Sequence, residues 1–272
     1  MKEFKSFYKT VTAAEGSRCK YNTRLDTYGC GCEHDCSYCY AKSLLEFRGM
    51  WNAEKPSVAD LMKIERKLDK VPAGTVLRLG GMTDCFQPCE SQYKITYETI
   101  KMLNDRNIGY LIVTKSDLVC DYMHILDKRL AHIQVSTTWL PCENAVPTER
   151  RINAAEALQK DGFDVAVRLS PFVAEIVDFR RLNAIKCDKV QVEFLRVNHW
   201  IRKWLPMDYS QYTLKSGGYN HLPLEVKIEH LKKITGFKEV SVCEDVPEHY
   251  EYWKNNVNQN KEDCCNLRRK EK

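Results

Sequence analysis

The chain has 272 residues, 43% of them hydrophobic and 29% charged, and is long enough to bury a substantial core. Its charges are mixed in sign and its 12 Gly and 9 Pro form no repeat, which excludes wholesale disorder and a fibrous protein. The opening MKEFKSFYKT lacks the apolar stretch of a signal peptide, and no run approaches the about 20 residues of a membrane span. We therefore expect a cytoplasmic protein without membrane contact.

The charge balance and the cysteine content narrow the class further. A formal net charge of +5 permits a polyanionic partner but does not demand one. Thirteen cysteines are an odd number and too small a fraction for a disulfide scaffold. In a chain without an export signal, such cysteines are more often thiols or metal ligands.

Short runs rich in Val, Ile and Leu alternate with amphipathic segments, which is typical of βα units around a parallel sheet. We predict a first strand just before Gly29. Further strands are predicted at Thr75–Leu79, Tyr110–Thr114, His132–Thr137, Asp164–Leu169 and Lys189–Phe194. Helices are predicted at Ala41–Phe47, Val58–Leu68, Gln92–Arg106, Leu118–Lys128, Pro147–Lys160 and Ala174–Asn183.

After Phe194 this alternation gives way to an aromatic, basic stretch, followed by a predicted helix at Leu224–Ile234 and a strand at Lys238–Cys243. We therefore divide the chain into a core, residues 1–200, and a C-terminal extension, residues 201–272, that packs on the core or closes it.

The segment YGCGCEHDCSYCYAK, residues 28–42, carries the strongest chemical signal. Cys32, Cys36 and Cys39 are spaced C-x3-C-x2-C just before a predicted helix. Three thiolates on one short loop can hold three irons of a four-iron cluster and leave the fourth iron open. A zinc site that adds Cys30 or His34 is the alternative.

These three cysteines resemble the signature of the radical S-adenosylmethionine superfamily, with Tyr38 at the aromatic position beside the last cysteine. The resemblance implies a [4Fe-4S] cluster whose open iron is chelated by S-adenosylmethionine (SAM). It also implies reductive cleavage of SAM to a 5′-deoxyadenosyl radical. The implied fold is an α/β partial (β/α)6 TIM-like barrel with a C-terminal extension.

Polar residues follow the predicted strands, where barrel enzymes place their chemistry. Gly80-Gly81 resembles the glycine motif of the family, whose backbone accepts the SAM amino group, while Lys115 and Ser136 resemble its carboxylate and ribose contacts. The residues assigned to cofactor binding are Tyr38, Gly80, Gly81, Thr83, Asp84, Lys115, Ser136 and Arg168.

Within the superfamily the chain resembles the spore photoproduct lyase group over residues 19–200. The matching pieces are Tyr38-Cys39-Tyr40, Thr83-Asp84, Val113-Thr114-Lys115-Ser116, Gln134-Val135-Ser136 and Arg151-Ile152-Asn153-Ala154-Ala155. In that group the radical abstracts hydrogen from a thymine dimer in DNA, a thiol returns hydrogen, and paired tyrosines assist.

The hydrogen-donating thiol of that group has no counterpart here, because Gly81 and Met82 stand where it is expected. Cys85 is the candidate substitute, with Cys89 on the same loop, and Tyr40 is the candidate catalytic tyrosine. An ordinary buried cysteine is the alternative for Cys85.

We therefore predict a radical SAM enzyme acting on a DNA base or nucleotide, in lyase-like repair or modification, reduced by an electron donor such as flavodoxin or ferredoxin. The alternatives are radical modification of a peptide and a non-catalytic zinc or iron–sulfur nucleic-acid-binding module. The run HWIRKW, residues 199–204, is either a nucleic-acid surface or a closing helix. Cys264-Cys265 is by itself a weak metal signal.

Overall fold

Eight strands form one sheet in the structure, a computed structural model that describes residues 4–12, 19–141, 144–243 and 245–268. Every neighbouring pair from β2 onward is parallel, and β1 is antiparallel to β2. Along the sheet the strands are β1 (Tyr8–Thr10), β2 (Thr23–Leu25), β5 (Val76–Leu79), β6 (Gly109–Thr114), β7 (Ala131–Ser136), β8 (Asp164–Phe172), β9 (Lys189–Phe194) and β12 (Glu239–Val242).

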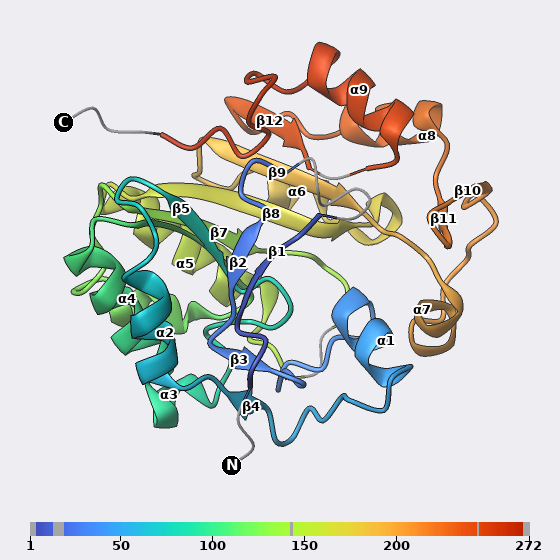
Figure 1. The fold of residues 1–272 in the computed structure, drawn as a ribbon. Coiled ribbons are helices and arrows are strands. Elements are labelled where there is room, and N and C mark those ends of the chain that lie inside the picture. Colours follow the sequence, from blue (N-terminus) through green and yellow to red (C-terminus); the bar gives the residue numbers. More distant parts are fainter. Residues whose placement is uncertain (1–3, 13–18, 142–143, 244, 269–272) are drawn as a thin grey trace.

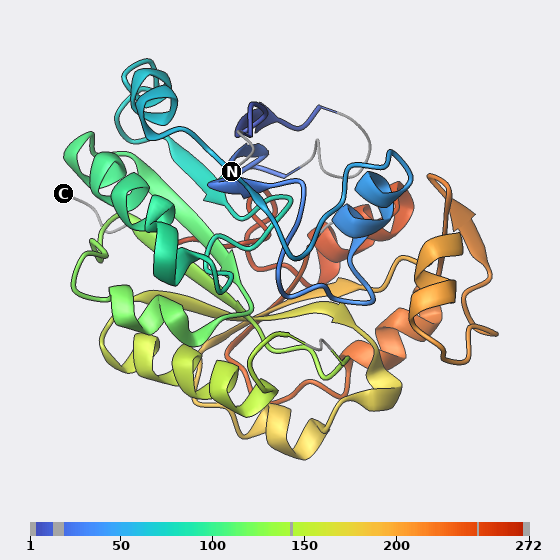
Figure 2. The same cartoon turned by 90° about the horizontal axis from the view of Figure 1, so that it is seen from below.

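Helices connect these strands and cover the outer side of the curved sheet (Figures 1 and 2). The helices are α1 (Tyr40–Glu46), α2 (Leu61–Leu68), α3 (Glu90–Tyr93), α4 (Ile95–Asp105), α5 (Thr148–Lys160), α6 (Phe179–Asn183), α7 (His199–Trp204), α8 (Leu224–Leu231) and α9 (Pro247–Asn256). Two small antiparallel pairs complete the structure, β3 (Tyr28–Gly29) with β4 (Ser57–Val58), and β10 (Leu214–Ser216) with β11 (Tyr219–His221). The predicted α/β class with a mostly parallel sheet is confirmed.

Strand alternation explains why one side of the sheet is apolar and the other polar. Ile133, Val167 and Val192 belong to the main apolar core. The intervening residues point to the inside of the sheet, where Arg168 donates hydrogen bonds to the side chains of Gln134, at 2.7 Å, and Gln191, at 2.6 Å. The curved sheet therefore encloses a polar interior.

The predicted helices differ from the structure at three places. The helix predicted at Ala174–Asn183 is divided into a 3-10 helix, η3 (Ala174–Ile176), and α6. The helix predicted at Gln92–Arg106 is split at Lys94, which has a φ of 57°. The carboxylate of Glu90 accepts the backbone N–H groups of Thr96 at 2.9 Å and Tyr97 at 3.0 Å, and so begins a new helix. The segment predicted as Leu118–Lys128 is instead a short 3-10 helix, η2 (Asp117–Tyr122).

The last third of the chain supplies a strand to the same sheet. β12 pairs in parallel with β9 and follows α8, so a further βα unit extends past residue 200 (Figure 1). Lys227 of α8 is buried and donates to Asp245, at 2.5 Å, which also accepts from Trp253 of α9 at 2.8 Å. This network ties the two last helices to the end of β12, while the division at residue 200 stays a prediction.

No helix among the described residues has both the length and the apolarity needed to cross a membrane.

Candidate active site

A cavity opens at the carboxyl ends of the parallel strands and holds about 920 Å³, its open mouth included. Barrel enzymes bind substrates at this end. The residues from the sequence prediction that line the cavity are Cys32, Cys36, Tyr38, Cys39, Tyr40, Gly80, Gly81, Thr83, Asp84, Lys115 and Arg168.

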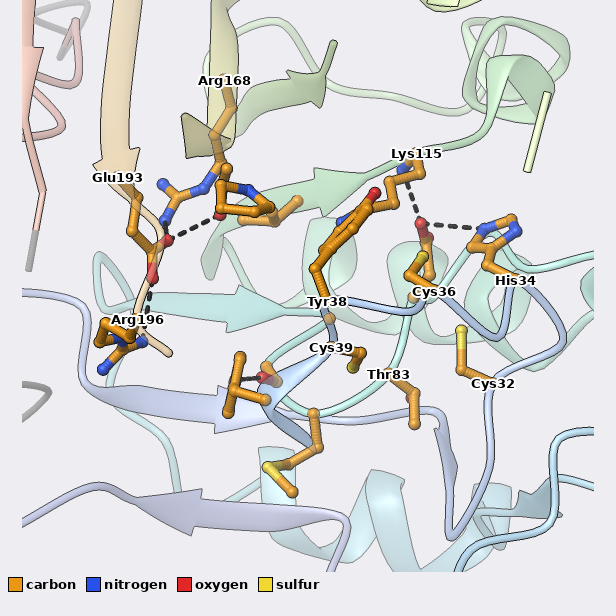
Figure 3. A pocket seen from close by; sticks show the side chains of 18 of the residues that line it. Cys32, His34, Cys36, Tyr38, Cys39, Thr83, Lys115, Arg168, Glu193 and Arg196 are labelled. Carbon is orange, nitrogen blue, oxygen red and sulfur yellow. Dashed lines mark hydrogen bonds and ion pairs between the residues drawn. The ribbon is translucent and has the colours of Figure 1, made fainter. Parts of the chain in front are cut away.

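The cysteine loop follows β3 and runs to the start of α1. Gly31 is required in it, because a Cβ there would lie 1.8 Å from the backbone oxygen of Asn52. The side chain of Asp35 is held by Lys42, at 2.9 Å, and by the indole nitrogen of Trp51, at 3.1 Å. This anchoring directs Cys32, Cys36 and Cys39 toward one part of the cavity (Figure 3).

The three cysteines are ligands of the type and number that an iron–sulfur cluster with one open iron requires. Three cysteines of one loop line the cavity, whereas Cys30 lies outside it and lines a separate surface hollow with Glu33 and Cys89. Among the described residues no three His, Cys, Asp or Glu side chains converge as the ligands of a single ion do. Cys36 is disulfide-bonded in this structure, so reduction must precede metal binding through its sulfur.

The backbone amide of Lys42 also donates to the sulfur of Cys39, at 3.4 Å. Hydrogen bonds of this kind tune iron–sulfur clusters. Burial, with the nearby charge of Asp84 adding to it, raises the pKa of the Cys32 thiol to about 12.

The turn after β5 brings bare backbone to the cavity. Gly80 has a φ of 81°, and a Cβ there would lie 2.8 Å from the carbonyl oxygen of Val113. The buried carboxylate of Asp26 accepts the N–H groups of Gly81, at 2.8 Å, and Met82, at 3.0 Å. Only glycine suits a left-handed position so close to another chain segment.

Asp84 is the hydrogen-bonding centre of the cavity floor. Its carboxylate lies 3.2 Å from His34 Nε2 and accepts from the Lys115 backbone N–H at 2.6 Å (Figure 3). It also accepts from the Thr114 hydroxyl at 2.8 Å. Burial alone raises the pKa of Asp84, but His34 and the backbone hydrogen bonds outweigh it and lower that pKa. The carboxylate is therefore a fixed anion beside the cysteine loop.

A lysine and two tyrosines stand between this floor and the mouth. The Lys115 ammonium lies 5.7 Å from the ring centre of Tyr38, and burial lowers the Lys115 pKa against the opposing effect of Asp84. Tyr40 is 38% exposed, and its hydroxyl donates to the carbonyl of Gly81. Its ring lies 5.7 Å from the Arg196 guanidinium.

The opposite wall carries a buried ion-pair network. Arg168 donates to Glu193 at 2.6 Å, and Glu193 also accepts from Ser170 at 2.8 Å and Arg196 at 3.0 Å (Figure 3). Burial alone raises the pKa of Glu193, but the two guanidinium groups hold it well below its ordinary value. Arg168 is therefore held in place at this wall by its pairing with Glu193.

Two predicted site residues do not line the cavity. Cys85 is 1% exposed within the apolar core, and burial raises its thiol pKa well above the ordinary value. Ser136 is fully buried, and its hydroxyl donates to the carbonyl of Ser170 at 3.3 Å. Thr83 does line the cavity, but its hydroxyl donates to the carbonyl of Tyr28 at 2.7 Å.

Arg78, Glu193 and Arg196 also line the cavity and were not predicted as site residues, while His34 was predicted only as a zinc ligand in the alternative interpretation. Arg78 and Glu193 could be found from strand alternation, since each is two residues from a polar or glycine position on the same strand face. His34 lies in the cavity because the folded cysteine loop brings its ring to Asp84.

The run at 199–204 forms α7. Ile201 is buried and lines the cavity, whereas Arg202 and Lys203 are exposed. Trp200 and Trp204 are half-buried, and the centres of their rings lie 5.5 Å apart. The helix therefore covers one side of the cavity and presents its cations to solvent.

Comparison with solved structures places the fold in a class, the partial barrel of radical SAM enzymes. The particular structures it matches are of spore photoproduct lyase. One, complexed with dinucleoside spore photoproduct, has a TM-score of 0.64 and 14% identity over 88% of this chain and 79% of that one. A mutant with bound AdoMet and dinucleoside spore photoproduct has a TM-score of 0.57 and 15% identity, over 88% and 80% of the two chains. The predicted partial barrel is thereby confirmed.

Sequence comparison reaches less far. No family model matches the chain. An uncharacterized protein of Methanocaldococcus jannaschii is 27% identical over 162 residues, which are 54% of this chain and 60% of that protein. The match thus spans less than two thirds of this curated relative.

Proposed function

We propose that the chain is a radical SAM enzyme that abstracts hydrogen from a DNA base or nucleotide. The observation that carries this proposal is the meeting of a three-cysteine loop and the Gly80-Gly81 turn in one cavity of a spore photoproduct lyase-like fold. The bound nucleotide lesion in the similar structures supports a nucleotide-type substrate.

The chain's own residues suit this chemistry. Cys32, Cys36 and Cys39 would hold a [4Fe-4S] cluster, which when bound supplies the electron that splits SAM into methionine and a 5′-deoxyadenosyl radical. The backbone of Gly80 and Gly81, held at Gly81 by Asp26, would accept the SAM amino group. Lys115, a partly buried cation that lines the same cavity, would pair with the SAM carboxylate.

For the radical step Cys85 is the predicted hydrogen donor and Tyr40 the predicted catalytic tyrosine. Cys85 lies in the core, so we propose that Tyr40, which lies at the mouth, is the residue that exchanges hydrogen with the substrate. Electron delivery by flavodoxin or ferredoxin stays a prediction.

The test is anaerobic reduction of the Cys36 disulfide with a thiol reductant, reconstitution with iron and sulfide, reduction of the cluster with dithionite, addition of SAM and detection of 5′-deoxyadenosine by mass spectrometry. Oligonucleotides carrying thymine lesions are then added, and binding is measured at several salt concentrations, because phosphate contacts weaken as salt rises. Formation of 5′-deoxyadenosine without any response to DNA would remove the nucleotide substrate. A cluster that never cleaves SAM would remove the enzyme proposal itself.

Tyr40→Phe and Cys85→Ala separate the two candidate hydrogen donors. We expect both variants to form 5′-deoxyadenosine, and only Tyr40→Phe to lose or divert product. Product loss in Cys85→Ala with normal product in Tyr40→Phe would reverse this assignment.

A further inference from the structure

A second group of cysteines lies apart from the cavity. Cys19, Cys243, Cys264 and Cys265 share one buried cluster with Tyr21 and Leu111. Their exposed fractions lie between 2% and 9%, and all four are thiols rather than disulfides. They come from three segments: the part before β2, the end of β12 and the tail after α9. The fold therefore gathers four reduced sulfurs that the sequence keeps apart.

The sulfurs lie in one buried cluster beside a polar donor. The side-chain amide of Gln191 points at the same place, with its nitrogen 3.4 Å from Cys265 Sγ and 3.8 Å from Cys264 Sγ. Amide donors aimed at sulfur are common around metal-bound thiolates and are not needed by cysteines that only fill space.

The tail that carries two of these cysteines has no regular structure to hold it. Residues 257–268, all of them described, form neither helix nor strand. The tail is attached instead by scattered hydrogen bonds, among them those from Lys189 Nζ to the Asn266 carbonyl at 2.6 Å and from Gln191 to the Cys264 carbonyl at 3.1 Å. Irregular segments with converging cysteines are commonly fixed by a metal.

We propose that Cys19, Cys243, Cys264 and Cys265 bind a second metal centre that fastens the tail and the segment before β2 to the end of β12. Four thiolates are the ligand set shared by structural zinc sites and iron–sulfur clusters, and the proposed ligand chemistry is common to both. Binding replaces the thiol protons, which are released to solvent.

The arrangement of the thiols indicates what binding requires. Nowhere in the described chain are three such ligands already placed around a single point, so the thiols must rotate to enclose a metal. Cys264 and Cys265 can do so, because no ladder or helix hydrogen bonds fix the tail.

The centre would lie one side chain away from the candidate active site. Gln191, whose nitrogen faces the thiols, accepts a hydrogen bond from Arg168 at 2.6 Å through its oxygen. A change at these cysteines would therefore affect the cavity through Gln191 and Arg168. For that reason the test measures metal content and not turnover.

The test uses the full chain with Cys32→Ala, Cys36→Ala and Cys39→Ala combined, which removes the candidate radical site and makes the result independent of the proposed function. The protein is loaded anaerobically with Zn²⁺ alone or with ferrous iron and sulfide, and metal is counted by mass spectrometry after desalting. We expect one zinc per chain, or iron with sulfide and a visible charge-transfer band. Adding Cys264→Ser and Cys265→Ser should lower metal content at least about tenfold.

The matched control adds Cys120→Ser and Cys187→Ser, two cysteines outside both groups, and should keep the metal. No metal in the triple variant, or metal that survives loss of Cys264 and Cys265, overturns the proposal. If the tail variants fail to fold, the wild-type chain is alkylated with and without a chelator. Joint modification of the four cysteines only after chelation supports the proposal, and modification independent of chelator overturns it.

Discussion

The two cysteine groups of this chain are assembled in opposite ways. Cys32, Cys36 and Cys39 lie within one loop of eight residues, so their spacing alone predicts what they can bind. The second group gathers sulfurs from both ends of the chain and from the residue after β12, and its only local pattern is the weak signal of Cys264-Cys265. The comparison teaches that a short motif identifies a site only when one loop supplies all of its ligands.

The largest effect is expected at the loop. Cys36→Ala should abolish the visible iron–sulfur absorbance and lower SAM cleavage at least about 100-fold, because changes to groups that merely contact a metal ligand already cost about 10- to 100-fold. Absorbance after reconstitution and 5′-deoxyadenosine formation are the measurements. Cys187→Ala, at a buried cysteine outside both groups, is the control. An unchanged spectrum in Cys36→Ala would contradict the ligand assignment.

The next largest effect is expected on the stability of the cavity wall, at its buried ion pair. Glu193→Gln removes the anion that pairs with buried Arg168, and should lower the free energy of unfolding by about 3 kcal/mol. The cost stays near the lower end of such losses because Gln134 and Gln191 still accept from Arg168.

Urea unfolding measures this loss, and an exposed ion pair provides its control. Glu149 pairs with Arg181 at 3.0 Å but is 59% exposed, so Glu149→Gln should change the free energy of unfolding by less than about 1 kcal/mol. Equal losses in the two variants would show that the buried network adds nothing beyond a surface pair.

Acid should weaken the interactions of Asp164, one of which holds the C-terminal tail. Asp164 contacts His132 at 2.7 Å, Lys189 at 2.7 Å and the backbone N–H of Arg268 at 2.9 Å. Burial alone raises the pKa of Asp164, but these partners lower it from 3.8 to about 2. Because the folded pKa is depressed, its stabilisation of about 2 kcal/mol is present above pH 4 and is lost as pH falls toward about 2.

Unfolding measured between neutral pH and about pH 3 checks the sign of this effect. Asp164→Asn should be less stable at neutral pH and should lose less stability on acidification than the wild type. Asp69→Asn, at an exposed surface pair, should follow the wild-type slope. Parallel slopes in wild type and Asp164→Asn would contradict the assignment.

The sequence predicts those parts of the molecule that neighbouring residues determine. The central strands, the cysteine loop and the glycine turn follow from contiguous patterns, and all lie where expected. The break at Lys94 was not predictable in this way, because it depends on the Glu90 carboxylate turning forward to begin the next helix.

Cys85 shows the same limit at the site. It follows Asp84, whose carboxylate lines the cavity, and proximity in sequence suggested that its thiol lies there too. The Asp84 carboxylate accepts the Phe86 N–H at 2.9 Å, and Thr96 donates to the Cys85 carbonyl at 2.6 Å. This tight turn directs the Cys85 side chain into the core, which only the folded chain reveals.

The smallest effect probes the attachment of the tail. Tyr21 donates its hydroxyl to the carboxylate of Asp263, which also accepts the N–H of Cys265 at 3.0 Å. Tyr21→Phe should lower the global free energy of unfolding by only about 1 kcal/mol, while the amides of residues 257–268 exchange with solvent markedly faster. Tyr209→Phe removes a hydroxyl that donates to the Leu205 carbonyl elsewhere, and should leave those amides unchanged. Faster exchange confined to the tail would show that it opens separately from the barrel, and uniform acceleration would show instead that the tail and the barrel unfold together.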